Sequence, residues 1–225
     1  MTRRIWQALI FGLVGTAILL SLGVWQVQRL SWKQGLIAEL EAKLAEPPGP
    51  LPDSPSERAH EYSRVRVEGR FGPEELHVIT SARRWGPGFR VIAPFETAEG
   101  RRVLVDRGYV PDEAKDAARA PGEATVTGAL LWPDETGFDT PEPDREANIW
   151  FARDTPAMAE ALGTAPVMIV AEGDAEDGTF PVPQPVTVNV RNDHLQYAVT
   201  WFGLAAIWIV MTVVVLFRLH RRGTL

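Results

Sequence analysis

The 225-residue sequence contains no cysteine and only three lysines. The absence of cysteine excludes disulfides, thiolate metal sites, redox dithiols and cysteine nucleophiles. Lys33 stands beside an apolar run, and Lys43 and Lys115 stand in charged stretches. None has the buried apolar setting that activates a lysine as a catalytic base, so a membrane-tethered Ser-Lys hydrolase is the most remote function that we consider.

Histidine is also scarce, and its spacing argues against a metal site built from protein ligands alone. His60, His77 and His194 are far apart, with no HxH or HxxxH pair, which disfavours zinc and di-iron centres. No nucleophile motif stands near His60 or His77, so a Ser-His-Asp site is not indicated either. The sequence has no basic stripe to neutralise phosphates, and we therefore exclude nucleic acid as a partner.

Charge is missing from two long apolar runs, residues 5–24 and residues 195–217. At about 1.5 Å per helical residue, each run is long enough to cross a hydrocarbon core about 30 Å thick. Five arginines lie in the two tails outside the runs, whereas all 29 Asp and Glu residues lie between them. The positive-inside rule then places both termini in the cytoplasm and the acidic middle outside it.

The chain begins without an Arg- and Ser-rich transit peptide, so we expect a multi-pass protein of the bacterial cell inner membrane with a periplasmic middle domain. A cleaved signal peptide with small residues at Ser21 and Gly23 is the alternative interpretation of the first run. The expected division is a first transmembrane helix (5–28), a helical extension with a Pro-rich linker (29–61), a mainly β domain (62–191), a second transmembrane helix (192–217) and a basic cytoplasmic tail (218–225).

The middle domain shows the period of two that is typical of β-strands. Apolar and polar side chains alternate over residues 64–69 and 76–80, and residues 89–95 and 102–106 flank a loop that suits a hairpin. One short helix is expected, with Asp154 or Thr155 as N-cap, Pro156 in its first turn and Gly163 after its end. Further candidate strands cover residues 124–131, 148–151, 167–171 and 185–190.

These patterns predict an α+β membrane protein. Two transmembrane helices at the termini flank an extracytoplasmic domain that is mainly antiparallel β, either a small barrel or a sandwich.

Aromatic and polar side chains gather where both apolar runs meet the outer membrane surface. Two aromatic residues follow His194 at helical spacings of three and seven, and Arg29 lies at helical spacing between two tryptophans. Two interpretations stay open. One is an interfacial aromatic belt in which Arg29 pairs with lipid phosphate, and the other is a haem pocket in which His194 is an axial ligand and Arg29 meets a propionate. The residues are His194, Tyr197 and Trp201 on the second run and Trp25, Arg29 and Trp32 on the first.

Three segments carry a family resemblance: LGVWQVQRLSWK at residues 22–33, RGYVP at residues 107–111 and NDHLQYAVTWF at residues 192–202. Through them the chain resembles the surfeit locus protein 1 family, assembly factors for cytochrome c oxidase, over nearly its whole length. GPGFRV at residues 86–91, followed by Pro94 and Phe95, looks like the family's loop and strand. Asp193 and Tyr109 depart from the pattern, since the family usually has Asn and commonly Trp at these positions.

The resemblance implies a protein that is not an enzyme, has no catalytic residue, and helps haem a reach the catalytic subunit of the oxidase, together with proteins of haem a synthesis or delivery. His194 is then the expected iron ligand. The alternative is an assembly chaperone or scaffold that binds the oxidase without holding haem. The expected haem-binding residues are His194, Tyr197, Trp201, Trp25 and Arg29, and the expected docking residues are Trp32, Arg107, Gly108 and Tyr109.

Overall fold

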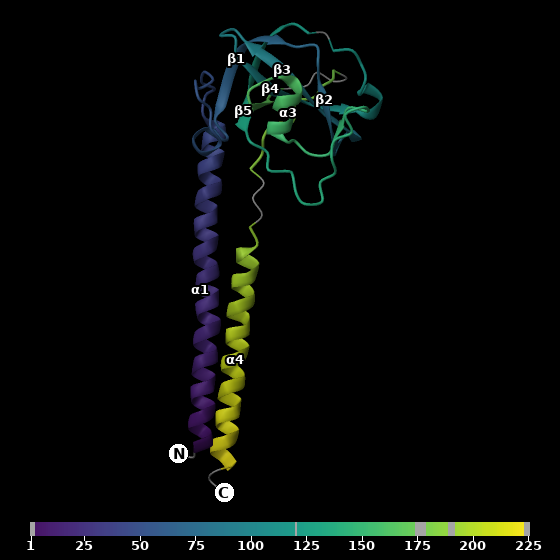
Figure 1. The fold of residues 1–225 in the computed structure, drawn as a ribbon. Coiled ribbons are helices and arrows are strands. Elements are labelled where there is room, and N and C mark those ends of the chain that lie inside the picture. Colours follow the sequence, from purple (N-terminus) through teal and green to yellow (C-terminus); the bar gives the residue numbers. More distant parts are fainter. Residues whose placement is uncertain (1–2, 120, 174–178, 189–191, 223–225) are drawn as a thin grey trace. The chain divides into compact units, whose positions relative to one another are not determined.

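The computed structural model describes residues 3–119, 121–173, 179–188 and 192–222, which belong to two compact units (Figure 1). The helical unit takes the chain up to Glu39 and again from Asn189 onward, and the β unit is Leu40–Val188. The fold class expected from the sequence is confirmed, because two apolar helices near the ends of the chain flank a sheet domain with a closed barrel.

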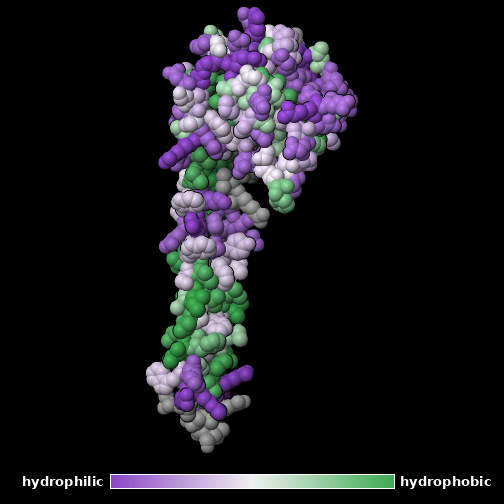
Figure 2. Space-filling model, in the orientation of Figure 1, coloured by the Kyte–Doolittle hydropathy of each residue, from purple (hydrophilic) through white to green (hydrophobic). Residues whose placement is uncertain are grey.

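The helical unit contains α4 (His194–Arg222) and most of α1 (Arg3–Ala45), whose last residues, from Leu40, belong to the β unit. Both helices are long and apolar enough to cross a membrane, and their hydrophobic residues form a band with hydrophilic residues at either end (Figure 2). Helix α1 has 43 residues, about twice what a bilayer needs, and it ends just before Pro47 and Pro48. Proline lacks the N–H donor that a helix requires, so this pair stops α1.

Small residues allow α1 and α4 to pack closely. The indole Nε1 of Trp208 donates a hydrogen bond to the Gly12 carbonyl oxygen at 3.1 Å. The same ring lies against Gly15, where a Cβ atom would come within 2.4 Å of it. Close contacts at glycine are typical of helix pairs in membranes. Buried residues of the pair include Gly12, Gly23 and Gln26 on α1 and Ala198 and Ala205 on α4.

The β unit is a closed barrel of five strands in the order β1-β5-β7-β4-β3, with β1 pairing back to β3. Strands β2 and β6 extend the sheet outward from β3. The strands are β1 (Arg64–Phe71), β2 (Leu76–Ala82), β3 (Gly86–Thr97), β4 (Arg102–Pro111), β5 (Glu123–Leu131), β6 (Ile149–Trp150) and β7 (Met168–Ala171). The short helices are α2 (Glu57–His60), α3 (Thr155–Leu162) and the 3-10 turn η1 (Asp112–Ala114).

Closure of the barrel depends on Gly69 of β1. This residue pairs with Ala124 of β5 on one side and with Thr97 of β3 on the other. A Cβ atom at Gly69 would lie 2.1 Å from the carbonyl oxygen of Glu96, far inside any normal contact. A glycine is therefore needed where β1 and β3 approach each other and close the ring.

Strand β4 contributes to apolar clusters on both of its faces, as the period of two requires. Val103 and Val105 belong to one cluster, which Phe95 of β3 also joins. Leu104, between them, belongs to a second cluster, where α3 covers the sheet with Met158 and Leu162. All six side chains are buried, so β4 is apolar on both faces and packs at the centre of the domain.

The structure confirms the expected short helix and its caps. Asp154 is the N-cap of α3, and its Oδ1 accepts a hydrogen bond from the Ala157 backbone N–H at 3.0 Å. Pro156 lies in the first turn, and Gly163 ends the helix with φ +61°, a left-handed conformation that suits glycine. The hairpin is confirmed as well, with β3 and β4 pairing from Gly88 to Glu96.

The strand expected over residues 185–190 is wrong for residues 185–188, which form no strand; residues 189 and 190 lie outside the described residues. Pro181, Pro183 and Pro185 each lack an N–H donor, so this stretch cannot sustain a ladder of hydrogen bonds. The pairing is instead a single bridge, in which Val182 and Tyr109 exchange two backbone hydrogen bonds of 2.8 Å.

Candidate functional site

His194 is the first residue of α4 and is held by a glutamine of α1. Its Nδ1 lies 2.7 Å from Oε1 of Gln26. Gln26 is only 7% exposed, whereas His194 is half-buried. An amide oxygen can only accept a hydrogen bond, so Nδ1 carries the proton and donates it. In the neutral ring, the lone pair then lies on Nε2.

The two aromatic residues after His194 differ in their exposure. Trp201, two turns further along α4, is half-buried, and Tyr197 is exposed. The backbone N–H of Tyr197 donates to the carbonyl oxygen of Asp193 at 3.2 Å, which makes Asp193 part of the first turn. These residues therefore offer one imidazole and one shielded indole near the start of α4.

On α1, Arg29 lies between Trp25 and Trp32, as its spacing predicts. The guanidinium carbon lies 6.0 Å from the Trp25 ring centroid and 5.4 Å from the Trp32 centroid. All three side chains are exposed, so this stripe lies outside the packed seam that contains the buried Gln26. The residue of α1 that contacts the His194 ring is therefore Gln26. The haem-binding and docking roles of the stripe stay predictions.

Gln26 was missed by the sequence analysis, although a signal for it exists. Gly12, Leu19, Gln26 and Lys33 recur every seven residues, and all four are buried or half-buried in α1. A seven-residue repeat marks the seam of a helix pair. One polar side chain within the apolar part of such a seam indicates a specific partner on the other helix.

The RGYVP segment ends β4 and contains a bulge. Val91 pairs with Gly108 and the next residue, Ile92, pairs with Asp106, so Arg107 is an extra residue in the strand. Gly108 has φ +109°, and a Cβ atom there would lie 2.0 Å from the carbonyl oxygen of Val182. Glycine is therefore required where the chain passes this close to its neighbour.

Tyr109 is fully buried and braces the loop between β2 and β3. Its hydroxyl donates to the carbonyl oxygen of Pro87 at 2.9 Å. Its ring stacks on Trp85, with centroids 5.7 Å apart and planes 18° apart. The docking role of Tyr109 stays a prediction. The group that this arrangement leaves at the surface is the Trp85 indole, which is 36% exposed and which the sequence analysis missed.

A buried carboxylate precedes the bulge and fixes it. Asp106 is fully buried, and its Oδ1 accepts from the Gly108 backbone N–H at 3.1 Å. Its Oδ2 accepts from Nε of Arg90 at 2.7 Å and from Nη1 of Arg153 at 3.2 Å. Burial lowers the pKa of Arg153, but its hydrogen bonds to Glu135 and the charge of Asp106 outweigh burial and raise it. The buried charges are paired, as their burial requires.

Arg107 lies over the ring of Phe71, with its guanidinium carbon 4.4 Å from the ring centroid. Burial lowers the pKa of Arg107, and the charge of Glu75 acts in the opposite direction. The side chain is half-buried, so it stacks against the barrel and only part of it reaches the surface. Its docking role also stays a prediction.

A second charged cluster joins β2 to the segment after η1. Glu75 accepts hydrogen bonds from Nε of Arg119 at 2.9 Å and 3.0 Å, and it lies 2.9 Å from Nε2 of the buried His77. Burial raises the pKa of Glu75, but the hydrogen bonds with His77 and Arg119 and the charge of Arg119 outweigh burial and lower it to about 2. Asn148 completes the cluster by donating to the Glu75 carbonyl oxygen at 2.8 Å.

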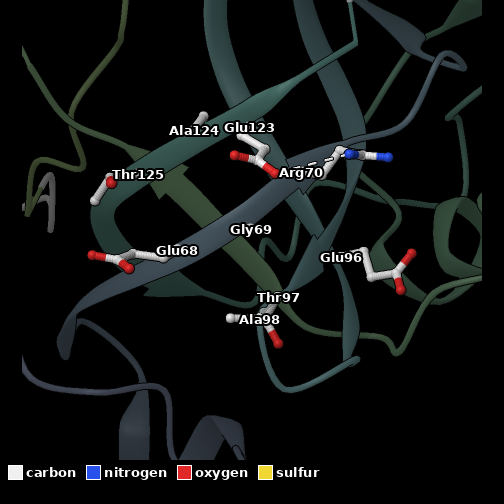
Figure 3. A pocket seen from close by; sticks show the side chains of 9 residues that line it. All are labelled: Glu68, Gly69, Arg70, Glu96, Thr97, Ala98, Glu123, Ala124 and Thr125. Carbon is white, nitrogen blue, oxygen red and sulfur yellow. Dashed lines mark ion pairs between the residues drawn. The ribbon is translucent and has the colours of Figure 1, made fainter.

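An open cavity of about 710 Å³ lies beside Gly69 where β1, β3 and β5 meet (Figure 3). Three glutamates line it, and the exposed Arg70 pairs with Glu123 at 3.9 Å. An anionic ligand with free carboxylates would meet like charge there, which disfavours its binding. The cavity therefore does not suit haem, whose propionates are anionic. The glutamates are Glu68, Glu96 and Glu123.

The fold and the His194–Gln26 pair define a membrane-anchored protein with a five-stranded barrel domain between two apolar helices. Residues 13–206 match the family model described as the SURF1 family, and the chain belongs to this family. It is 35% identical to Surfeit locus protein 1 of Rattus norvegicus over 82% of this chain and 68% of that protein. It is also 36% identical to Surfeit locus protein 1 of Homo sapiens, over 82% of this chain and 69% of that protein. The identity to a SURF1-like protein of Monosiga brevicollis is 36% as well, over 90% of this chain and 83% of that protein.

Proposed function

We propose that this protein is an assembly factor for haem-copper cytochrome c oxidase that holds haem a through His194 and presents it to the catalytic subunit. Membership of the SURF1 family supports the role in oxidase assembly. The observation that carries the haem a step is the 2.7 Å hydrogen bond between Nδ1 of His194 and Oε1 of Gln26. A histidine that binds a metal commonly donates its other ring N–H to an oxygen acceptor in this way.

The residues present fit a haem better than a bare metal ion. Among the described residues, no three His, Asp or Glu side chains gather to hold a metal. A haem needs only one or two protein ligands, because its porphyrin supplies four nitrogens to the iron. The Nε2 lone pair of His194 would serve as a ligand to the haem iron. The half-buried Trp201 offers an apolar surface for a macrocycle, and the exposed Arg29 offers a cation for a propionate.

The proposal includes a location and a set of partners. The arginines in both tails support cytoplasmic termini and an acidic β unit on the other side of the membrane. The proposed location is the bacterial inner membrane, with the β unit in the periplasm. The partners would be the oxidase catalytic subunit and the proteins that make or deliver haem a. No catalysis is required of a protein in this role, and we propose that it is not an enzyme.

The test is the pigment of the purified protein. Full-length protein isolated from a strain that makes haem a is expected to show a haem a Soret band, because Nε2 of His194 ligates the iron. His194→Ala should lose or shift this band. His220→Ala is the matched control, since His220 lies near the other end of the same helix, and it should keep the wild-type spectrum.

A colourless wild type under these conditions would overturn the haem a proposal. Co-purification of that colourless protein with the oxidase would then support the alternative, a chaperone or scaffold that binds the enzyme without haem. The exposed indoles of Trp32 (60%) and Trp85 (36%) favour this alternative, because exposed tryptophans are common at protein interfaces.

A further inference from the structure

We infer that Gln26 is a positioning residue that sets the tautomer and the orientation of the His194 ring. The inference rests on the proposed function, because the tautomer and orientation of the ring affect how Nε2 binds a ligand. It begins from the contact across the two helices, in which Nδ1 of His194 lies 2.7 Å from Oε1 of Gln26. These residues are 168 positions apart in the chain, so the contact exists only when α1 and α4 are paired.

The burial of Gln26 indicates that its amide oxygen has a specific role as a hydrogen-bond acceptor. It is buried in α1, where the other buried residues are Gly12 and Gly23. A buried amide costs free energy unless it is hydrogen-bonded, and a leucine would fill an apolar seam without this cost. A hydrogen bond between membrane helices contributes little free energy on average, so helix pairing alone is a weak reason for a glutamine here. A stronger reason is that the amide oxygen sets the tautomer and orientation of the His194 ring.

The chemical effect of Gln26 follows from the donor and acceptor roles. With the Nδ1 proton directed at an amide oxygen, Nε2 keeps its lone pair, and the ring cannot turn without losing the bond. Donation to an oxygen also makes the imidazole a more basic ligand. Gln26 thus prepares Nε2 before any ligand arrives, while touching none itself. Removing such a partner commonly costs about 10-fold to 100-fold in metal affinity.

The experiment reads the tautomer directly in the ligand-free protein. Full-length chain with ¹⁵N-labelled histidine is studied in detergent micelles by NMR at a pH where the imidazole is neutral, and His194 is assigned from the spectrum of His194→Ala. The wild type should show the tautomer protonated at Nδ1. Gln26→Leu should lose that tautomer, whereas Gln26→Glu, which retains an oxygen acceptor, should restore it.

Haem a binding gives the second readout. Gln26→Leu should weaken haem a binding about 10-fold to 100-fold. Gln26→Glu should bind haem a with a lower midpoint potential, because a carboxylate acceptor makes the imidazole more electron-rich. Gln28→Leu is the matched control, since Gln28 is an exposed glutamine of the same helix, and it should behave as the wild type.

The outcomes separate this inference from the proposed function. An unchanged His194 tautomer in Gln26→Leu overturns the inference, even where the wild type binds haem a. The expected tautomer change in a wild type that binds no haem a supports the role of Gln26 toward the ring and overturns the proposed function instead. Equal loss of helix pairing in Gln26→Leu and Gln26→Glu, without restoration of the tautomer, would mean that Gln26 only joins the helices.

Discussion

Gly108 shows how much of this fold depends on single residues. Its N–H is bound by the buried Asp106, its φ is +109°, and the backbone of Val182 passes where a side chain would be. The RGYVP motif was visible in the sequence, but its geometry was not. The bulge depends on a charge network that includes Arg153, 45 positions after Gly108, and such a partner leaves no local pattern.

Gly108→Ala is therefore expected to destabilise the protein by at least about 3 kcal/mol, because it adds a collision to a left-handed backbone. The measurement is urea unfolding of the detergent-solubilised protein, followed by tryptophan fluorescence.

Two further glycines distinguish the effect of the collision from the effect of the left-handed backbone. Gly100 has φ +79° and open space around it, so Gly100→Ala should cost about 1 kcal/mol from the backbone alone. Gly122 has open space and no left-handed backbone, so Gly122→Ala should change little. Equal effects at all three positions would contradict the role assigned to the contact with Val182.

Contacts between residues on the two different helices could not be predicted from the sequence. His194, Tyr197 and Trp201 could be placed together by spacing, since they share one helix. Gln26 could not be assigned to His194 in the same way, because the partner of a buried amide is set by how two helices pair. The burial of Tyr109 was equally hidden, since an aromatic residue at the end of a strand suits either a core or a surface.

At the scale of elements, the Glu75 cluster fixes the start of β2. Its carboxylate binds Arg119, its backbone oxygen accepts from Asn148 just before β6, and its partner His77 is buried in the strand. This cluster ties three separate segments of the chain together around one negative charge.

The cluster predicts a specific pH dependence. The folded-state pKa of Glu75 is about 2, below the usual 4.5, so the fold favours the charged carboxylate. Its stabilisation is present above about pH 4.5 and is lost as the pH falls toward 2. The shift corresponds to about 3 kcal/mol. Urea unfolding between neutral pH and about pH 3 should therefore show a steeper loss of stability in the wild type than in Glu75→Gln.

Glu96→Gln is the control for this series, because Glu96 is an exposed glutamate of β3. It should follow the wild-type pH dependence. A Glu75→Gln protein that loses stability as steeply as the wild type would show that other carboxylates dominate the acid response.

Strands were predictable from alternation, whereas their partners were not. The hairpin of β3 and β4 could be predicted because a short loop joins its strands. Closure of the barrel could not, because β1 and β3 are separated by β2 and meet only at Gly69 and its neighbours. The choice between a barrel and a sandwich depended on whether β1 and β3 approach each other at Gly69. A single glycine in a strand is only a weak sign of such an approach.

At the scale of the whole molecule, the lack of cysteine makes the membrane orientation easy to test. We expect Ala98→Cys, at an exposed position after β3, to react with a membrane-impermeant maleimide in intact spheroplasts. His220→Cys, at the exposed C-terminal end of α4, should react only after the membrane is permeabilised. These results would follow from a periplasmic β unit and cytoplasmic termini. Labelling of the second variant alone in intact spheroplasts would mean the opposite orientation.

Closure of the barrel also limits how this protein can recognise another chain. Each strand of the ring has hydrogen-bonded neighbours on both sides over at least part of its length, and β6 covers the outer side of β2 at His77 and Val78. Within the described strands, the ring therefore offers little free edge to which a foreign strand could be added, whereas β2 beyond Val78 has no further strand on its outer side. Recognition of another chain by the ring would then use side chains and loops and not backbone pairing. A closed ring also removes a common route to aggregation, which is the pairing of exposed strand edges between molecules.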